Sequence, residues 1–243
     1  SAGRAYTCAI TAGAFGNRVK CWGYSGNGQL GDGRTGLHGE PATVLLAPNA
    51  GVTTTTLSAS PGASSYGQPV TLTATVHNGN APTGFVEFSA NDFYIAGCES
   101  VALTGGQAQC VTSALPIGTN TLKATYGGDT GNAASSGTLS YEVTRATVTL
   151  TITAHTPDPS AVLSPVMVSV ALVVAPGTGT PTGTVAVSRG VDGCTITLPA
   201  TSCALTPTAT GTVDIVASYG GDGNFLPSTA SPFAHTATAL VQN

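Results

Sequence analysis

Charged side chains are scarce in this chain of 243 residues. Only 7% of the residues are Asp, Glu, Lys or Arg, whereas soluble domains ordinarily carry about 25%. The formal net charge is −4, which gives no reason to expect nucleic acid or an anionic membrane as a partner. Thr, Ser, Asn and Gly must keep the surface soluble, a composition that suits extracellular β-structure better than cytosol.

Long hydrophobic runs and catalytic motifs are also absent. No stretch of about 18 apolar residues occurs, so we expect no membrane-spanning helix. There is no GxSxG motif, and the glycine-rich segment 26–33 lacks the Lys and the helix that a phosphate site needs. The sequence therefore predicts no enzymatic activity and no cofactor.

The four histidines are scattered along the chain, and no HxH or HExxH pattern links them. They are His38, His77, His155 and His235. From this spacing we expect structural roles for them and no metal site.

Alternating residues dominate what is present. Apolar residues alternate with Thr and other polar residues in segments 70–76, 147–153 and 212–219. This period of two is typical of half-buried antiparallel strands. Segment 166–174 is apolar on both faces, so its second face needs cover from a neighbouring domain or chain. With 32 Gly and 15 Pro and no helical periodicity, the chain is predicted to be all-β.

The sequence from Thr53 onward repeats itself. PTGFVEF at 82–88 matches PTGTVAV at 181–187, and ATYGGD at 124–129 matches ASYGGD at 217–222. The two matches give a period of about 95 residues, the size of an immunoglobulin-like sandwich. We therefore predict two Ig-like β-sandwiches, at residues 49–145 and 146–243.

These copies resemble bacterial Ig-like repeats of the Big_3 group. The resemblance rests on TTTTLSASPGASSYGQPVTLTATV, PTGFVEF and the two YGGD turns. It implies non-catalytic modules that serve as stalks and spacers in secreted or surface-attached bacterial proteins. The second copy departs from the pattern at its start, where Thr156-Pro157-Asp158-Pro159 replaces Ser60-Pro61-Gly62.

The N-terminal residues 1–48 form a different unit. Residues 6–48 resemble one RCC1-type repeat, through Cys8 and Cys21, the VKCWG run at 19–23 and GQLGDG at 28–33. Such a repeat implies a single propeller-blade-like β unit with a binding or scaffold role. One repeat cannot bury its own apolar faces, so we expect it to lean on the rest of the chain or on another molecule.

Six cysteines fall into three local pairs, one for each proposed domain. The pairs are Cys8–Cys21, Cys98–Cys110 and Cys194–Cys203. Six cysteines allow 15 pairings, but locality makes this one the simplest, with each bridge stapling a hairpin. Zinc would need CxxC or Cys/His clusters, and none occur. Disulfides imply an oxidising compartment, so the sequence predicts a secreted or cell-surface protein.

Two acidic turns are weak candidates for calcium. Asp129 and Asp222 occupy equivalent YGGD turns with oxygen-bearing neighbours. A hydrogen-bonded Asx turn explains the same residues equally well.

Charge asymmetry suggests that copies of the chain associate. Residues 1–50 carry a net charge of +2 and the remainder −6. The leading hypothesis is a structural subunit of an extracellular fibre or surface layer. It would assemble head to tail through the N-terminal unit and open sheet edges, in a non-closing arrangement. The candidate contacts are Arg4, Arg18, Lys20, Trp22 and Tyr24.

Two alternatives remain open. The chain could be an Ig-like stalk segment of a larger surface adhesin. It could also be a carbohydrate-binding module that meets cell-surface glycans through Trp22, Tyr24, Phe93 and Tyr94.

Overall fold

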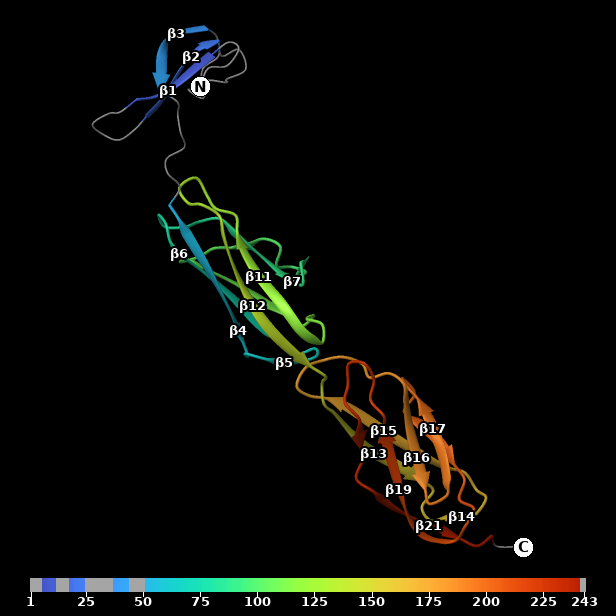
Figure 1. The fold of residues 1–243 in the computed structure, drawn as a ribbon. Coiled ribbons are helices and arrows are strands. Elements are labelled where there is room, and N and C mark those ends of the chain that lie inside the picture. The colour runs from blue at the N-terminus through green and yellow to red at the C-terminus, as the bar shows by residue number, and fades with distance from the viewer. Residues whose placement is uncertain (1–5, 12–17, 25–36, 44–50, 241–243) are drawn as a thin grey trace.

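The computed structural model describes residues 6–11, 18–24, 37–43 and 51–240. These residues form β-strands and contain no helix, as the sequence predicts. Figure 1 shows two β-sandwiches arranged end to end. The described part of the chain has no helix of the length and hydrophobicity that a membrane span requires.

The N-terminal unit contains three antiparallel strands in the order β1-β2-β3. They are β1 (Tyr6–Thr11), β2 (Arg18–Tyr24) and β3 (Leu37–Thr43). Among the strands that the structure describes, these three pair only with one another. Cys8 lies directly opposite Cys21 across the β1–β2 pair, and the two are disulfide-bonded. Cys21 is fully buried.

The first sandwich consists of two facing sheets. One sheet has the order β10-β6-β4, and the other β5-β12-β11-β7-β8 with β9 beside β7. The strands are β4 (Thr53–Ser60), β5 (Ser64–Ser65), β6 (Val70–Asn78), β7 (Phe85–Ala90), β8 (Phe93–Tyr94), β9 (Val101–Ala102), β10 (Gln107–Thr112), β11 (Gly118–Tyr126) and β12 (Ser135–Thr144). The chain crosses between the sheets after β4, because β5 pairs in parallel with β12.

The second sandwich repeats this topology. Its sheets have the orders β13-β15-β18 and β14-β21-β19-β16-β17, with β20 beside β19. The strands are β13 (Val148–Thr156), β14 (Ser160–Ala161), β15 (Val166–Val174), β16 (Thr184–Arg189), β17 (Asp192–Thr197), β18 (Ser202–Leu205), β19 (Gly211–Tyr219), β20 (Ser228–Thr229) and β21 (Phe233–Thr238). Again a short strand after the first one, β14, pairs in parallel with the last, β21.

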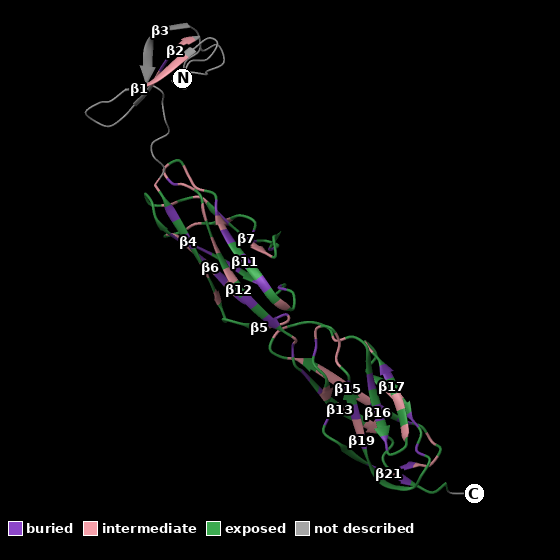
Figure 2. Ribbon diagram, viewed as in Figure 1, coloured by how far each residue is buried: buried purple, intermediate pink, exposed green. Residues whose placement is uncertain are grey.

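Each sandwich has its own core, made by the inward-facing residues of the alternating strands (Figure 2). In β6, Val70, Leu72 and Ala74 are fully buried while the Thr residues between them are partly exposed. Phe88, Tyr126 and Tyr141 are the largest fully buried side chains of the first core. Full burial of each such large apolar side chain stabilises the fold by about 2–3 kcal/mol.

The outer face of β15 is apolar except for Ser169, close to what the sequence predicts, and the described elements leave much of it uncovered. Met167 is 45% exposed and Val173 57%. The equivalent strand of the first sandwich, β6, presents Thr71, Thr73 and Thr75 on that face. The expected cover by another domain or chain remains a prediction.

Candidate functional sites

The joint between the two sandwiches combines a short linker, several hydrogen bonds and an aromatic contact. Only residues 145–147 separate β12 from β13, and each of the three is hydrogen-bonded to the second sandwich. Arg145 Nη2 donates to the carbonyl oxygens of Asp222 and Phe225. The Ala146 N–H donates to Asn224 O at 2.9 Å. The Thr147 hydroxyl donates to Ala175 O. Hydrogen bonds to the second sandwich thus hold all three linker residues and restrict bending at the joint.

One aromatic side chain of the first sandwich packs across the joint onto the second sandwich. Tyr66, in the turn after β5, packs edge-on against Phe225 with ring centroids 5.8 Å apart and planes at 89°. Tyr66 packs against the hydrophobic core of the second sandwich, in which Phe225 is buried. An aromatic pair in this geometry contributes about 0.5–1.5 kcal/mol beyond the area it buries.

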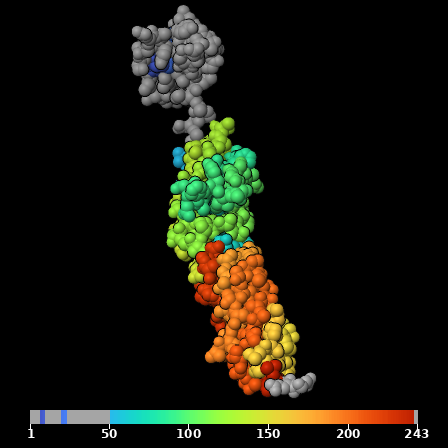
Figure 3. Space-filling view, turned by 90° about the vertical axis from the view of Figure 1, so that its right-hand side faces the viewer, coloured from blue at the N-terminus to red at the C-terminus, as the bar shows by residue number. Residues whose placement is uncertain are grey.

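A backbone contact lies beside the aromatic pair. The Thr178 N–H donates to Gly67 O at 3.2 Å. A Cβ added at Gly67 would lie 2.0 Å from Thr178 O, and one at Gly177 would lie 2.8 Å from Tyr66 O. The two loops approach so closely because both positions are glycine. Figure 3 shows the surfaces of the two sandwiches in direct contact.

The Asp129 turn ties two loops of the first sandwich together. Asp129 Oδ2 accepts hydrogen bonds from the N–H and hydroxyl of Thr83, both at 2.9 Å, and from the Tyr126 hydroxyl at 3.1 Å. Its Oδ1 accepts from Gly131 N and from the amide of Asn132. Hydrogen bonds from Asn132, Thr83 and Gly131 lower the pKa of Asp129 well below its usual value.

Asp222 repeats this arrangement in the second sandwich. It accepts from the N–H and hydroxyl of Thr182 at 2.8 and 2.7 Å, and from the N–H groups of Asn224 and Phe225. Burial alone would raise the pKa of Asp222, but these hydrogen bonds outweigh it and lower the pKa to about 2. Burial raises the pKa of Tyr219 to about 12, and the neighbouring Asp222 acts in the same direction.

The two Asp turns explain why PTG and YGGD recur together in the sequence. Each carboxylate accepts from the N–H and hydroxyl of the PTG threonine and from donors of its own turn, and a calcium ion would have to displace these hydrogen bonds. A hydrogen-bonded latch therefore accounts for Asp129 and Asp222 without a metal ion.

The structure contains the three disulfides of the expected pairing. The expectation that each staples a hairpin was wrong for two of them. Cys110 lies in β10 of one sheet, while the carbonyl of Cys98 accepts from β7 of the facing sheet. Likewise Cys194 lies in β17 and Cys203 in β18, on opposite sheets. These two bridges cross-link the sheets, because the chain changes sheets between the paired residues.

The predicted assembly contacts lie at the edge of what the structure describes. Arg4 and the GQLGDG motif fall outside the described residues. Arg18 and Tyr24 are the first and last residues of β2, and Lys20 and Trp22 within it are partly buried. Their role in assembly remains a prediction.

Two aromatic residues that we considered for carbohydrate binding are well exposed. Phe93 and Tyr94 form β8, at the edge of its sheet, and are 79% and 64% exposed. Together with Ile95, Leu115 and Pro116 they line a shallow pocket of about 420 Å³. This arrangement keeps a glycan contact open as a hypothesis.

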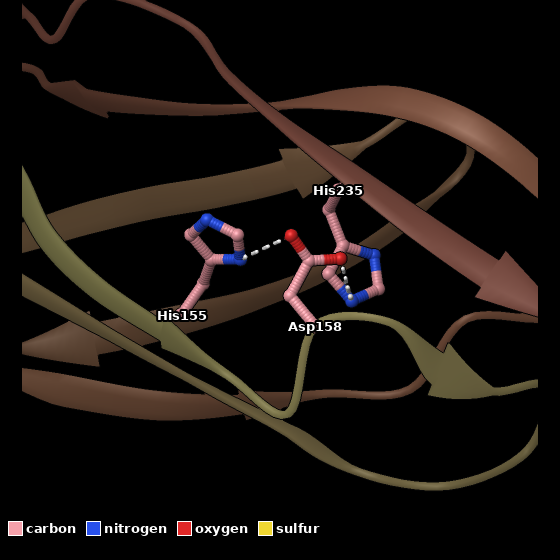
Figure 4. A group of neighbouring side chains, drawn as sticks. All are labelled: His155, Asp158 and His235. Atoms are coloured by element: carbon pink, nitrogen blue, oxygen red, sulfur yellow. Dashed lines mark ion pairs between the residues drawn. The ribbon is translucent and has the colours of Figure 1, made fainter.

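Sequence reasoning missed a cluster of His155, Asp158 and His235 (Figure 4). The two histidines, scattered in the sequence, meet with ring centroids 5.7 Å apart. They come from β13 and β21, with Asp158 in the turn that follows β13. Only the departure at Thr156-Pro157-Asp158-Pro159 marked this region in the sequence.

Comparison with known proteins supports the Ig-like part of the chain. Residues 55–153 match the family described as bacterial Ig-like domain (group 3). This match spans the first sandwich and the start of the second. No match to an RCC1-type repeat accompanies it, so that resemblance remains a prediction. No curated protein matches the chain in sequence.

Several solved structures resemble the chain at low similarity. The Escherichia coli adhesin FdeC is 13% identical, with 98% of this chain and 84% of FdeC covered and a TM-score of 0.33. The Yersinia pseudotuberculosis adhesin InvE is 14% identical, with 76% and 59% covered and a TM-score of 0.36. The fibronectin(III)-like modules of Clostridium thermocellum CbhA are 16% identical, with 75% and 93% covered and a TM-score of 0.31. We draw no functional conclusion from these likenesses.

Proposed function

We propose that this chain is a non-catalytic spacer of an extracellular or surface-attached bacterial protein, a stalk segment of the adhesin type. The joint between the sandwiches is the observation that supports this most directly. A linker of three residues, all hydrogen-bonded, and an aromatic pair hold one module at the end of the next. The bacterial Ig-like family match and the cross-sheet disulfides agree with a module that works outside the cell.

Small-angle X-ray scattering of the full chain tests this function. A spacer must keep its length, so we expect a single extended particle whose maximum dimension does not change with salt or temperature below melting. A compact particle, or a broad range of dimensions typical of freely jointed modules, would contradict the proposal.

Head-to-tail fibre assembly is the second candidate, and one observation favours it. Strands β1–β3 form a sheet that pairs with no other described strand, and open sheet edges can accept a strand from another copy. Deleting residues 1–48 should then abolish fibres seen by negative-stain microscopy while residues 49–243 stay folded. Light scattering that shows a monodisperse monomer of the full chain would favour the spacer function alone.

Glycan binding is tested separately, on the exposed pair in β8. Binding to a glycan array that is lost on substituting both Phe93 and Tyr94 with Ala would support it. An array without hits would remove it.

A further inference from the structure

Three potential metal ligands converge at one place in the second sandwich. Asp158 lies between two imidazoles, with His155 Nδ1 4.0 Å from Asp158 Oδ2 and His235 Nε2 3.9 Å from Asp158 Oδ1 (Figure 4). The ligand atoms of the three residues all lie within 4.8 Å of one another. One nitrogen atom of each histidine and the carboxylate thus surround a common point.

These distances are too long for hydrogen bonds, which require about 2.7–3.2 Å. Yet the His155 side chain is only 6% exposed, and its Nδ1, aimed at the carboxylate, has no hydrogen-bond partner. A buried polar atom normally finds a partner. An ion placed among the three ligands would supply one for His155 Nδ1.

The first sandwich shows that the fold does not need these residue types. There the Tyr141 hydroxyl donates to Pro61 O at 3.1 Å. At the equivalent place His235 Nε2 lies 3.2 Å from Pro157 O. In both sandwiches, one hydrogen-bond donor to the proline carbonyl is therefore enough at this position, and it need not be a histidine.

The other two ligands have no polar side chain opposite them in the first sandwich. Aligning the two prolines places Ala59 at the position of His155 and Gly62 at that of Asp158. All three positions thus differ together, with Ala59, Gly62 and Tyr141 in the first sandwich and His155, Asp158 and His235 in the second.

We propose that His155 Nδ1, His235 Nε2 and the Asp158 carboxylate bind a divalent transition-metal ion of the zinc class. Two imidazoles and one carboxylate favour zinc, copper or nickel over magnesium and calcium, which prefer oxygen ligands. In a tetrahedral zinc centre ligand atoms lie about 3.3 Å apart, so the two contacts of Asp158, at 4.0 and 3.9 Å, must each close by roughly 0.6–0.7 Å, and the ligand atoms, which lie within 4.8 Å of one another, by at most about 1.5 Å. The Asp158 side chain is 34% exposed, so it can move, and a water molecule can complete the coordination.

The surroundings of the ligands limit the affinity. The Thr236 N–H donates to Asp158 Oδ1 at 3.0 Å and orients the carboxylate. His235 Nδ1, by contrast, is buried without a partner, and it must carry the proton when Nε2 binds the ion. Binding through Nε2 also gives up the hydrogen bond that this atom donates to Pro157 O. Missing outer-shell partners typically weaken binding about 10- to 100-fold, so we expect weaker binding than at a site whose histidines both have such partners.

Isothermal titration calorimetry of the untagged full chain with zinc chloride tests the site. We expect one zinc per chain, and no binding heat with magnesium chloride. Asp158→Asn and His155→Gln should each weaken zinc binding at least about tenfold, while the matched control His77→Gln in the first sandwich should bind as the wild type does. No binding by the wild type, or unchanged binding by both site variants, would overturn the proposal.

A second measurement avoids dependence on the variants' folding. In ¹H–¹⁵N spectra of the wild-type imidazoles, zinc should shift the signals of His155 and His235 and leave those of His77 in place. Shifts confined to other histidines would assign the zinc elsewhere and refute this site.

Discussion

At the scale of single residues, the charges of this chain act locally, inside turns. Asp129 and Asp222 each fix a loop by accepting hydrogen bonds from the PTG motif that precedes the neighbouring strand. Asp192 also fixes a loop, because its carboxylate accepts hydrogen bonds from the hydroxyl and the N–H of Thr208. These two hydrogen bonds lower the pKa of Asp192. Three of the few acidic residues of this chain thus stabilise loops through hydrogen bonds to their carboxylates.

Acid should weaken both sandwiches through these carboxylates. Their pKa values are lowered in the folded state, that of Asp222 from 3.8 to about 2. Their contribution to stability is therefore present above about pH 4 and is lost as the pH falls toward 2. The melting temperature measured across this range should fall. A melting temperature that stays level from pH 5 to pH 2 would contradict this prediction.

The variant Asp222→Asn separates this contribution from that of the other acids. It keeps the shape of the side chain but removes its charge, and should destabilise the second sandwich by about 2 kcal/mol at pH 7. The difference from the wild type should shrink near pH 2, because the pKa of Asp222 in the folded protein is about 2 and about half of its carboxyl groups are then protonated. Urea unfolding at the two pH values measures it, and a difference that is independent of pH would count against the latch.

At the scale of elements, the contacts between sheets and between modules matter most. The disulfides Cys98–Cys110 and Cys194–Cys203 cross-link facing sheets, with Cα atoms 5.8 and 6.1 Å apart. Cys194–Cys203 joins β17 to β18, and Cys98–Cys110 joins the segment between β8 and β9 to β10, across sheets that share no strand pairing. The joint holds the two modules together in a similar way. There the loop of Thr178 packs against the backbone of Gly67, where a Cβ atom would leave no room for it.

Removing one cross-sheet disulfide should weaken only its own sandwich. In the chain-entropy model, closing a loop of this length contributes about 3 kcal/mol. In the double variant Cys194→Ser/Cys203→Ser, the free energy of unfolding of the second sandwich should fall by about 3 kcal/mol. Hydrogen exchange, which resolves the two modules, should show the loss there, and equal losses in both modules would argue against independent cores.

A methyl group at Gly67 should open the joint. The Cβ of Gly67→Ala would meet the backbone of Thr178, whereas the control Gly62→Ala, nearby in the chain, meets nothing within 4 Å. We expect scattering profiles of the first variant to show flexing modules and those of the control to match the wild type. Leu163, which aligns with Gly67 in the second copy, also has a positive φ, of 63°. A non-glycine residue is thus accommodated at the equivalent position.

The elements themselves could be read from the sequence, while the sites that join them could not. Alternating residues and the repeat of about 95 residues predict the strands and the two sandwiches. Tyr66 and Phe225 look like two core aromatics, because nothing local shows that they meet across a joint. His155 and His235 are similarly distant in sequence, and they meet through the pairing of β14 with β21 and the packing of His155 against Phe233.

At the scale of the whole molecule, the central claim is that the two sandwiches behave as one rigid body. Residual dipolar couplings of the weakly aligned full chain test it most directly, because they report the orientation of each backbone N–H. We predict that one alignment tensor fits both sandwiches, residues 53–144 and 148–238, and that Gly67→Ala splits it into two. Two different tensors in the wild-type protein would show that the modules move independently, and would contradict the account.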